Sequence, residues 1–137
     1  MNVRDGMTHV VLTVGPAHTL REAARQMSAR HVGAAVVTDA ERAGIGILTE
    51  RDILDSVGAG QDPDTELVGD HRTGDVVFAS PDWTMEHAAA AMVHGNFRHL
   101  VVIENNEVIG LLSMRDIVRS WSGAAAGAGR ERATAQA

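Results

Sequence analysis

A hydroxyl residue and an aspartate recur at the same spacing in two places of this 137-residue chain. The stretch GILTERDIL (46–54) contains Thr49 and Asp52, and GLLSMRDIV (110–118) contains Ser113 and Asp116. An ionised carboxylate can accept hydrogen bonds from both hydroxyls of a ribose, and a hydroxyl at a helix start can bind the sugar or a phosphate. The residue types therefore suit a nucleoside phosphate. The same spacing is also that of a capping box, a common way to begin a helix.

The residues around both motifs add charge and an apolar surface. Arg51 and Arg115 precede the two aspartates, and arginine beside the free amides of a helix start favours phosphate. Gly46 and Gly110 lie three residues before the hydroxyls, where a glycine permits close approach of a ligand or of backbone. Apolar residues of neighbouring strands can enclose a flat base, and the candidates are Val14, Ala35 and Ala79.

The two motifs belong to a repeat that extends over most of the chain. Thr19 corresponds to Thr84 and Met27 to Met92, each 65 residues further on. After one deletion the interval becomes 64 residues, which places Asp52 on Asp116. Agreement along so much of the chain indicates two copies of one supersecondary unit.

Each copy predicts the same order of elements, β-α-β-β-α. A threonine N-cap and apolar residues at positions i, i+3, i+4 and i+7 predict the first helix of each copy, over 20–30 and 85–94. The second helix begins at each motif, giving predicted helices over 50–57 and 114–122. Apolar runs predict the strands, which are 10–14, 33–39, 44–49, 75–79, 99–105 and 108–113.

The predicted fold class is α/β in the broad sense (α+β), with two β-α-β-β-α repeats packed around a pseudo-twofold axis. The first repeat spans 1–60 and the second 75–122, with a linker and lead-in turn over 61–74. The Gly/Ala-rich segment 123–137 is predicted to be a disordered tail.

Composition excludes several classes of function. The net charge of −6 argues against binding of duplex nucleic acid, which needs a basic face. The chain has neither cysteine nor lysine, so it has no thiolate nucleophile, no Schiff-base lysine and no Walker A loop. No metal-ligand spacing such as His-Glu-x-x-His occurs, so no metal site is expected. No apolar run is long enough to cross a membrane and no signal segment precedes the repeats, so we expect a cytoplasmic protein.

These features together resemble a tandem pair of cystathionine-β-synthase (CBS) domains. The resemblance covers about residues 3–121 and rests on the openings MT…VVLTV…P and RTGDVVFASP, on FRHLVVI and on the two motif endings. It implies a regulatory, non-catalytic module whose paired sheets form two clefts for adenosine-containing ligands. The candidate ligands are AMP, ADP, ATP and S-adenosylmethionine, and no cofactor is required.

The resemblance also implies roles for individual residues. Asp52 and Asp116 would hold the ribose, with Thr49 and Ser113 beside the ribose or phosphate. The residues implied near phosphate are Arg51, Arg115, Arg98 and His99. The first repeat has Gly33-Ala34 in place of the Arg98-His99 pair, so the two sites need not be equivalent. The resemblance further implies a flat homodimer formed by helices from both repeats.

Three functions follow as hypotheses. The first is an energy-sensing module that binds an adenine nucleotide and modulates an unknown effector protein in trans, since no effector domain is expected beside the pair. The second is a non-catalytic dimerisation scaffold with vestigial nucleotide sites. The third is an enzyme that uses His99 and Asp116, a weaker hypothesis because the chain lacks a thiol and a Gly-x-Ser-x-Gly motif.

Overall fold

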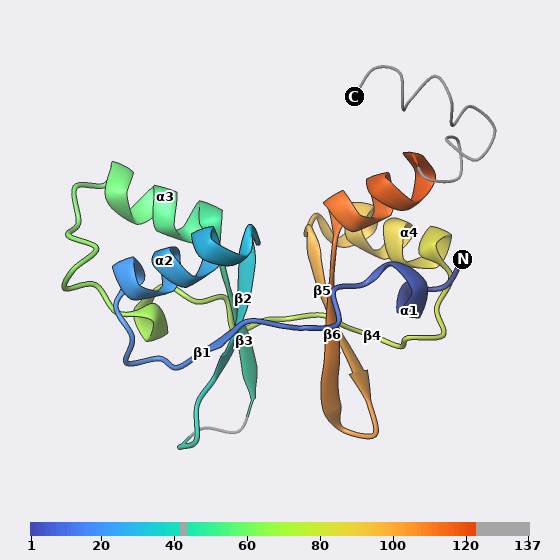
Figure 1. Cartoon of the computed structure of the whole chain (residues 1–137), viewed down its shortest axis with the longest axis horizontal. Coiled ribbons are helices and arrows are strands. Elements are labelled where there is room, and N and C mark those ends of the chain that lie inside the picture. The colour runs from blue at the N-terminus through green and yellow to red at the C-terminus, as the bar shows by residue number, and fades with distance from the viewer. Residues whose placement is uncertain (42–43, 123–137) are drawn as a thin grey trace. The chain divides into compact units, whose positions relative to one another are not determined.

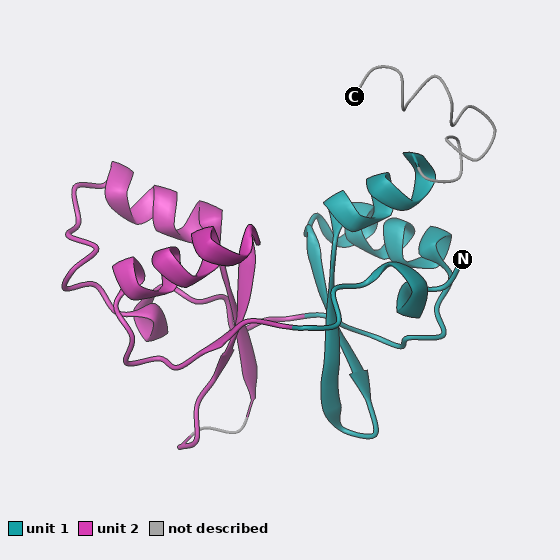
Figure 2. Ribbon diagram, viewed as in Figure 1, with its two compact units in different colours: residues 1–10, 77–137 teal, residues 11–76 magenta. Residues whose placement is uncertain are grey.

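The computed structural model describes residues 1–41 and 44–122 (Figure 1). These residues contain two three-stranded sheets, with strand orders β1-β2-β3 and β4-β5-β6, each accompanied by helices. The chain divides into two compact units: unit 1 combines Met1–Val10 with the chain from Val77 onward, and unit 2 is Val11–Val76 (Figure 2). The mixed α+β class predicted from the sequence is confirmed. The tail predicted to be disordered lies outside the described residues.

Unit 2 contains the first sheet and its helices (Figure 1). Its elements in chain order are β1 (Thr13–Val14), α2 (Leu20–Arg30), β2 (Ala34–Thr38), β3 (Ile45–Thr49), α3 (Glu50–Gly58) and the short 3₁₀ helix η1 (Val68–Asp70). β1 runs parallel to β2, and β2 pairs antiparallel with β3, so that Ala34 lies opposite Thr49. Helix α2 begins where predicted because the Thr19 hydroxyl accepts the Glu22 N–H at 3.1 Å.

One apolar face of α2 closes the core of unit 2. Leu20, Ala23 and Met27 recur at helical spacing and are buried, as the periodicity predicts. The sheet residues in the same core are Val14, Ala35, Val37 and Leu48. Val68 of η1 is fully buried in this core.

Unit 1 repeats this arrangement. Its elements are α1 (Val3–Gly6), β4 (Phe78–Ala79), α4 (Met85–Gly95), β5 (His99–Glu104), β6 (Glu107–Ser113) and a helix over residues 114–122. β4 runs parallel to β5, and β5 pairs antiparallel with β6, which places His99 opposite Ser113. Met85, Ala88 and Met92 of α4 are buried in the core, as the equivalent residues of α2 are.

The segments before β1 and β4, which we call the lead-in segments (residues 7–12 and 72–77), differ from the prediction. Strands were predicted over 10–14 and 75–79, but β1 and β4 have two residues each. The reason is that the first segment pairs with β6 within unit 1 and the second pairs with β3 within unit 2. Thr8 exchanges two backbone hydrogen bonds with Leu111, at 2.9 and 3.1 Å, and Thr73 does so with Ile47, at 2.8 and 3.0 Å. The predicted linker 61–74 lies wholly within unit 2.

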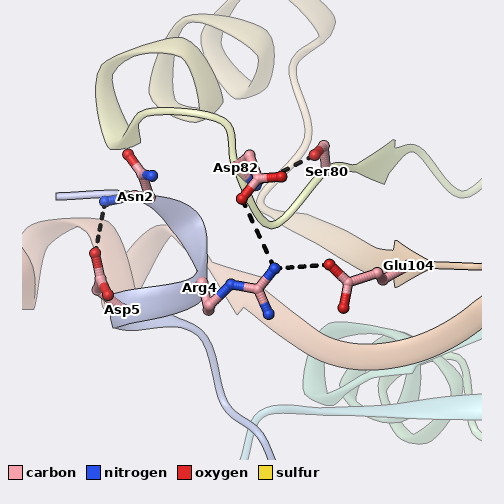
Figure 3. Close-up of polar contacts among 6 residues, drawn as sticks. All are labelled: Asn2, Arg4, Asp5, Ser80, Asp82 and Glu104. Carbon is pink, nitrogen blue, oxygen red and sulfur yellow. Dashed lines mark hydrogen bonds and ion pairs between the residues drawn. The ribbon is translucent and has the colours of Figure 1, made fainter.

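The N-terminal residues are held in unit 1 by polar contacts (Figure 3). The Arg4 guanidinium donates to Glu104 Oε2 at 2.7 Å and lies 3.7 Å from Asp82 Oδ1. The hydrogen bond to Glu104, with its negative charge, raises the pKa of Arg4 above its ordinary value. The Val3 N–H donates to the Trp83 carbonyl at 2.8 Å. Residues 1–10 come from the first sequence repeat but therefore lie in unit 1, together with the second repeat. The segment up to Val76 leads into the second repeat but lies in unit 2.

Candidate functional site

In unit 2 the predicted motif lies at the junction of β3 and α3. Thr49 has extended backbone and is the N-cap of α3. Its hydroxyl accepts the Asp52 N–H at 3.2 Å, and its own N–H donates to Asp52 Oδ2 at 2.8 Å. The motif is therefore a complete capping box, the structural alternative that the spacing left open. Asp52 is half-buried, and its Oδ1 takes no part in the box.

Unit 1 builds the same box at the start of the helix over 114–122. The Ser113 hydroxyl accepts the Asp116 N–H at 3.1 Å, and the Ser113 N–H donates to Asp116 Oδ2 at 2.8 Å. Asp116 is 7% exposed, and its Oδ1 lies 3.5 Å from a guanidinium nitrogen of Arg119. An ionised carboxylate offers about four acceptor positions, so the box leaves capacity for a ligand in both units.

The structure brings Arg98 and His99 next to the unit 1 motif. His99 lies opposite Ser113 across β5 and β6, and the Arg98 carbonyl accepts the Met114 N–H at 2.9 Å. The Gly33 carbonyl accepts the Glu50 N–H at the same distance in unit 2. The side chains of Arg51, Arg115 and Arg98 are exposed and available to solvent anions.

The three residues predicted to enclose a base lie in the two hydrophobic cores. Val14, Ala35 and Ala79 are at most 2% exposed and belong to the hydrophobic cores beneath α2 and α4. Their part in enclosing a base stays a prediction. Val36, the next residue of β2, points to the opposite face of the sheet and is buried as well. The continuous apolar run of this strand therefore does not indicate which face packs against the helices.

The glycines before the motifs accommodate backbone. A Cβ at Gly110 would lie 3.0 Å from the Thr8 carbonyl oxygen and 2.4 Å from Met7 Sδ. A Cβ at Gly46 would lie 3.1 Å from the Thr73 carbonyl oxygen. The sequence left open whether these glycines permit the close approach of a ligand or of backbone. In the structure, the lead-in segments lie next to Gly46 and Gly110.

Two features of the site were not predicted. The lead-in segments were missed because their pairing joins residues far apart in the sequence. Arg119 was missed although its position, one helical turn after Asp116, was a usable signal. Within residues 1–41 and 44–122, no three histidine, aspartate or glutamate side chains gather as a metal site, and no helix is long and apolar enough to cross a membrane.

Two β-α-β-β-α repeats, each with a hydroxyl–aspartate box at the start of its last helix, define a tandem repeat module. The model of the CBS domain family matches residues 2–59 and 68–123 of the chain. The chain therefore belongs to the CBS domain family, as the sequence motifs indicated.

Relatives support this assignment. The chain is 44% identical over 104 residues to the CBS domain-containing protein CBSCBSPB5 of Arabidopsis thaliana, a match that covers 75% of this chain but 19% of that protein. It is 33% identical over 130 residues to the CBS domain-containing protein YhcV of Bacillus subtilis, covering 92% of this chain and 90% of the relative. The CBS domain protein PAE2072 from Pyrobaculum aerophilum, solved in complex with AMP, is 27% identical with a TM-score of 0.74, covering 85% of this chain and 89% of that chain.

Proposed function

We propose that this chain is a regulatory module that binds an adenosine-containing nucleotide and modulates a partner protein. Asp52 and Asp116 accept the ribose hydroxyls of the ligand, and Thr49 and Ser113 lie beside the ribose or phosphate. Arg51, Arg98, Arg115 and His99 supply the polar surroundings of the phosphate. The candidate ligands are AMP, ADP, ATP and S-adenosylmethionine.

The observation that carries the proposal is the identical hydroxyl–aspartate geometry in both units. In each unit the box uses one carboxylate oxygen and fixes the direction of the aspartate against the helix backbone. A carboxylate held in this way needs no reordering when a diol binds, which lowers the entropic cost of binding. The AMP complex of a related CBS domain protein points to the same class of ligand.

The first experiment is a thermal-shift panel of the four candidate ligands on the full chain. A ligand present at 100 times its dissociation constant stabilises a protein by about 2.7 kcal/mol, which is readily measured. Calorimetric titration of the best ligand is then repeated with Asp52→Ala and Asp116→Ala. Loss of a charged hydrogen-bond partner removes roughly 1.5–3 kcal/mol, so the affinity of the altered site should fall about tenfold or more.

The matched control is Asp5→Ala. Asp5 Oδ2 accepts the Asn2 N–H at 2.9 Å in the capping box of α1, so this change removes the same kind of contact outside both motifs. Loss of a cap contact costs about 1 kcal/mol of stability at each position, but only the two motif variants should lose affinity. Unchanged affinity in the Asp52→Ala/Asp116→Ala double variant would defeat the ribose assignment.

A second candidate function, a dimerisation scaffold with vestigial nucleotide sites, is favoured by exposed apolar residues on the motif helices. Leu54 and Val57 of α3 are 60% and 50% exposed, and the equivalent Val118 and Trp121 are both 52% exposed. Regularly placed apolar residues of this kind suit a second copy of the chain. A dimer that binds none of the four ligands would support the scaffold over the sensor.

A further inference from the structure

The two motifs match in geometry but carry opposite charge in their surroundings. In unit 2 the motif helix begins with a single arginine, Arg51, among the carboxylates of Glu50, Asp52 and Asp55. In unit 1 the motif helix begins with a single carboxylate, Asp116. Two arginines of the same helix, Arg115 and Arg119, lie near it in the sequence, and Arg98 precedes the neighbouring strand. The two repeats thus share the box and the arginine before each aspartate, and the net charge of the neighbouring positions is negative in unit 2 and positive in unit 1.

The clearest reversal lies one helical turn after each aspartate. Asp55 and Arg119 occupy the same position of the repeat, three residues after Asp52 and Asp116. Side chains three residues apart are neighbours on a helix surface. Arg119 therefore approaches Asp116 Oδ1 to 3.5 Å, whereas Asp52 has a like charge at this position.

A second difference lies at the residue just before β2 and β5, beside each helix start. Arg98 and Gly33 correspond, and each carbonyl accepts the first N–H of the motif helix. In unit 2 a Cβ at Gly33 would lie 3.3 Å from the Glu50 carboxylate, so an acidic group occupies the space beside this residue. In unit 1 the residue before the strand is Arg98, and the first helix residue is the uncharged Met114.

We infer that the two motifs distinguish adenosine ligands by charge. The unit 1 motif favours ligands with a phosphate, such as AMP, more strongly than the unit 2 motif does. In unit 2, Glu50 and Asp55 offset the charge of Arg51, so that adenosine or S-adenosylmethionine binds there at least as well as AMP. Guanidinium groups bind phosphate oxygens through charged hydrogen bonds, and carboxylates repel them. This inference rests on the proposed function and adds to it which motif takes which ligand.

The test compares AMP with adenosine in variants that keep one motif. Asp52→Asn leaves the unit 1 motif intact, and Asp116→Asn leaves the unit 2 motif intact; asparagine retains an oxygen for the cap contact. Calorimetric titrations give the ratio of the adenosine and AMP dissociation constants in each variant. We expect AMP to bind several times more tightly than adenosine in Asp52→Asn, and no better than adenosine in Asp116→Asn.

Charge exchange then assigns the cause. Arg119→Asp added to Asp52→Asn should lower the ratio of the adenosine to the AMP dissociation constant about fivefold. This is the size of effect expected from the interaction of exposed charges. Asp55→Arg added to Asp116→Asn should raise it by a similar factor. Arg119 and Asp55 are both exposed, so neither change removes a core contact.

The outcomes separate the two proposals. Equal AMP preference in the two single-motif variants, or preferences that the charge exchanges leave unchanged, would overturn the charge inference while nucleotide binding stands. Failure of the unaltered chain to bind AMP and adenosine would overturn the charge inference, and failure to bind any of the four candidate ligands as well would overturn the proposed function.

Discussion

Replacing Gly110 by alanine tests the contact between the N-terminal lead-in segment and β6. The added Cβ would lie 2.4 Å from Met7 Sδ and 3.0 Å from the Thr8 carbonyl oxygen. The methionine side chain is flexible and can move away. The Thr8 backbone is less free, since it exchanges hydrogen bonds of 2.9 and 3.1 Å with Leu111. The variant must therefore strain or weaken this pairing.

The expected loss of stability is about 2 kcal/mol. Overpacking of a close-packed site costs roughly 1–3 kcal/mol, and each weakened backbone hydrogen bond contributes up to about 1 kcal/mol. Urea unfolding followed by tryptophan fluorescence suits the measurement, because Trp83 packs against the core of unit 1 and Trp121 also lies in unit 1. The midpoint should fall without a change in slope.

Gly74→Ala is the matched control. A Cβ at Gly74 meets no atom within 4 Å, so the variant should be unchanged or stabilised by up to about 1 kcal/mol through the unfolded state. If Gly110→Ala lowers the midpoint no more than Gly74→Ala does, then Gly110 is not required for the close approach of the lead-in segment.

Two further predictions concern assembly and ligand response. Leu54→Glu with Val118→Glu, at residues 60% and 52% exposed, should convert a homodimer into a monomer in sedimentation experiments. The control Val93→Glu on α4, at a residue 75% exposed, should leave the dimer intact. An unaltered chain that is monomeric at micromolar concentration would contradict this assembly. AMP should lower hydrogen exchange in residues 46–54 and 110–118 without turnover of the nucleotide, and a hydrolysed or transferred product that Asp116→Ala abolishes would favour an enzyme instead.

Local signals explain which parts of the fold could be predicted. Helix α2 has the predicted bounds and α4 is one residue longer than predicted, because a threonine hydroxyl starts each helix and an apolar stripe runs along it. The lengths of β1 and β4 depend on where Thr8 and Thr73 pair, and these partners lie in distant parts of the sequence. Strand periodicity contains no information on such pairing.

The same distinction applies to the candidate site. The position of each motif could be predicted because a capping box is a local device, complete within four residues. The residues expected to enclose a base could not be assigned to a face, because neighbouring residues of β2 such as Ala35 and Val36 are all buried. An alternating strand would have separated the core face from the other face; a continuous apolar run does not.

The strand that ends at each motif also pairs with a lead-in segment, so the motif and this pairing share one strand. In unit 1, β6 ends at Ser113, pairs with Thr8 at Leu111 and accommodates that pairing at Gly110. The segment that begins at Thr8 continues covalently to Thr13, where it pairs with β2 of unit 2. Gly110→Ala should for this reason lower the stability of unit 1 through the Thr8 pairing and leave the Asp116 box intact, whereas Asp116→Ala should lower both the stability, through the lost cap contact, and the affinity.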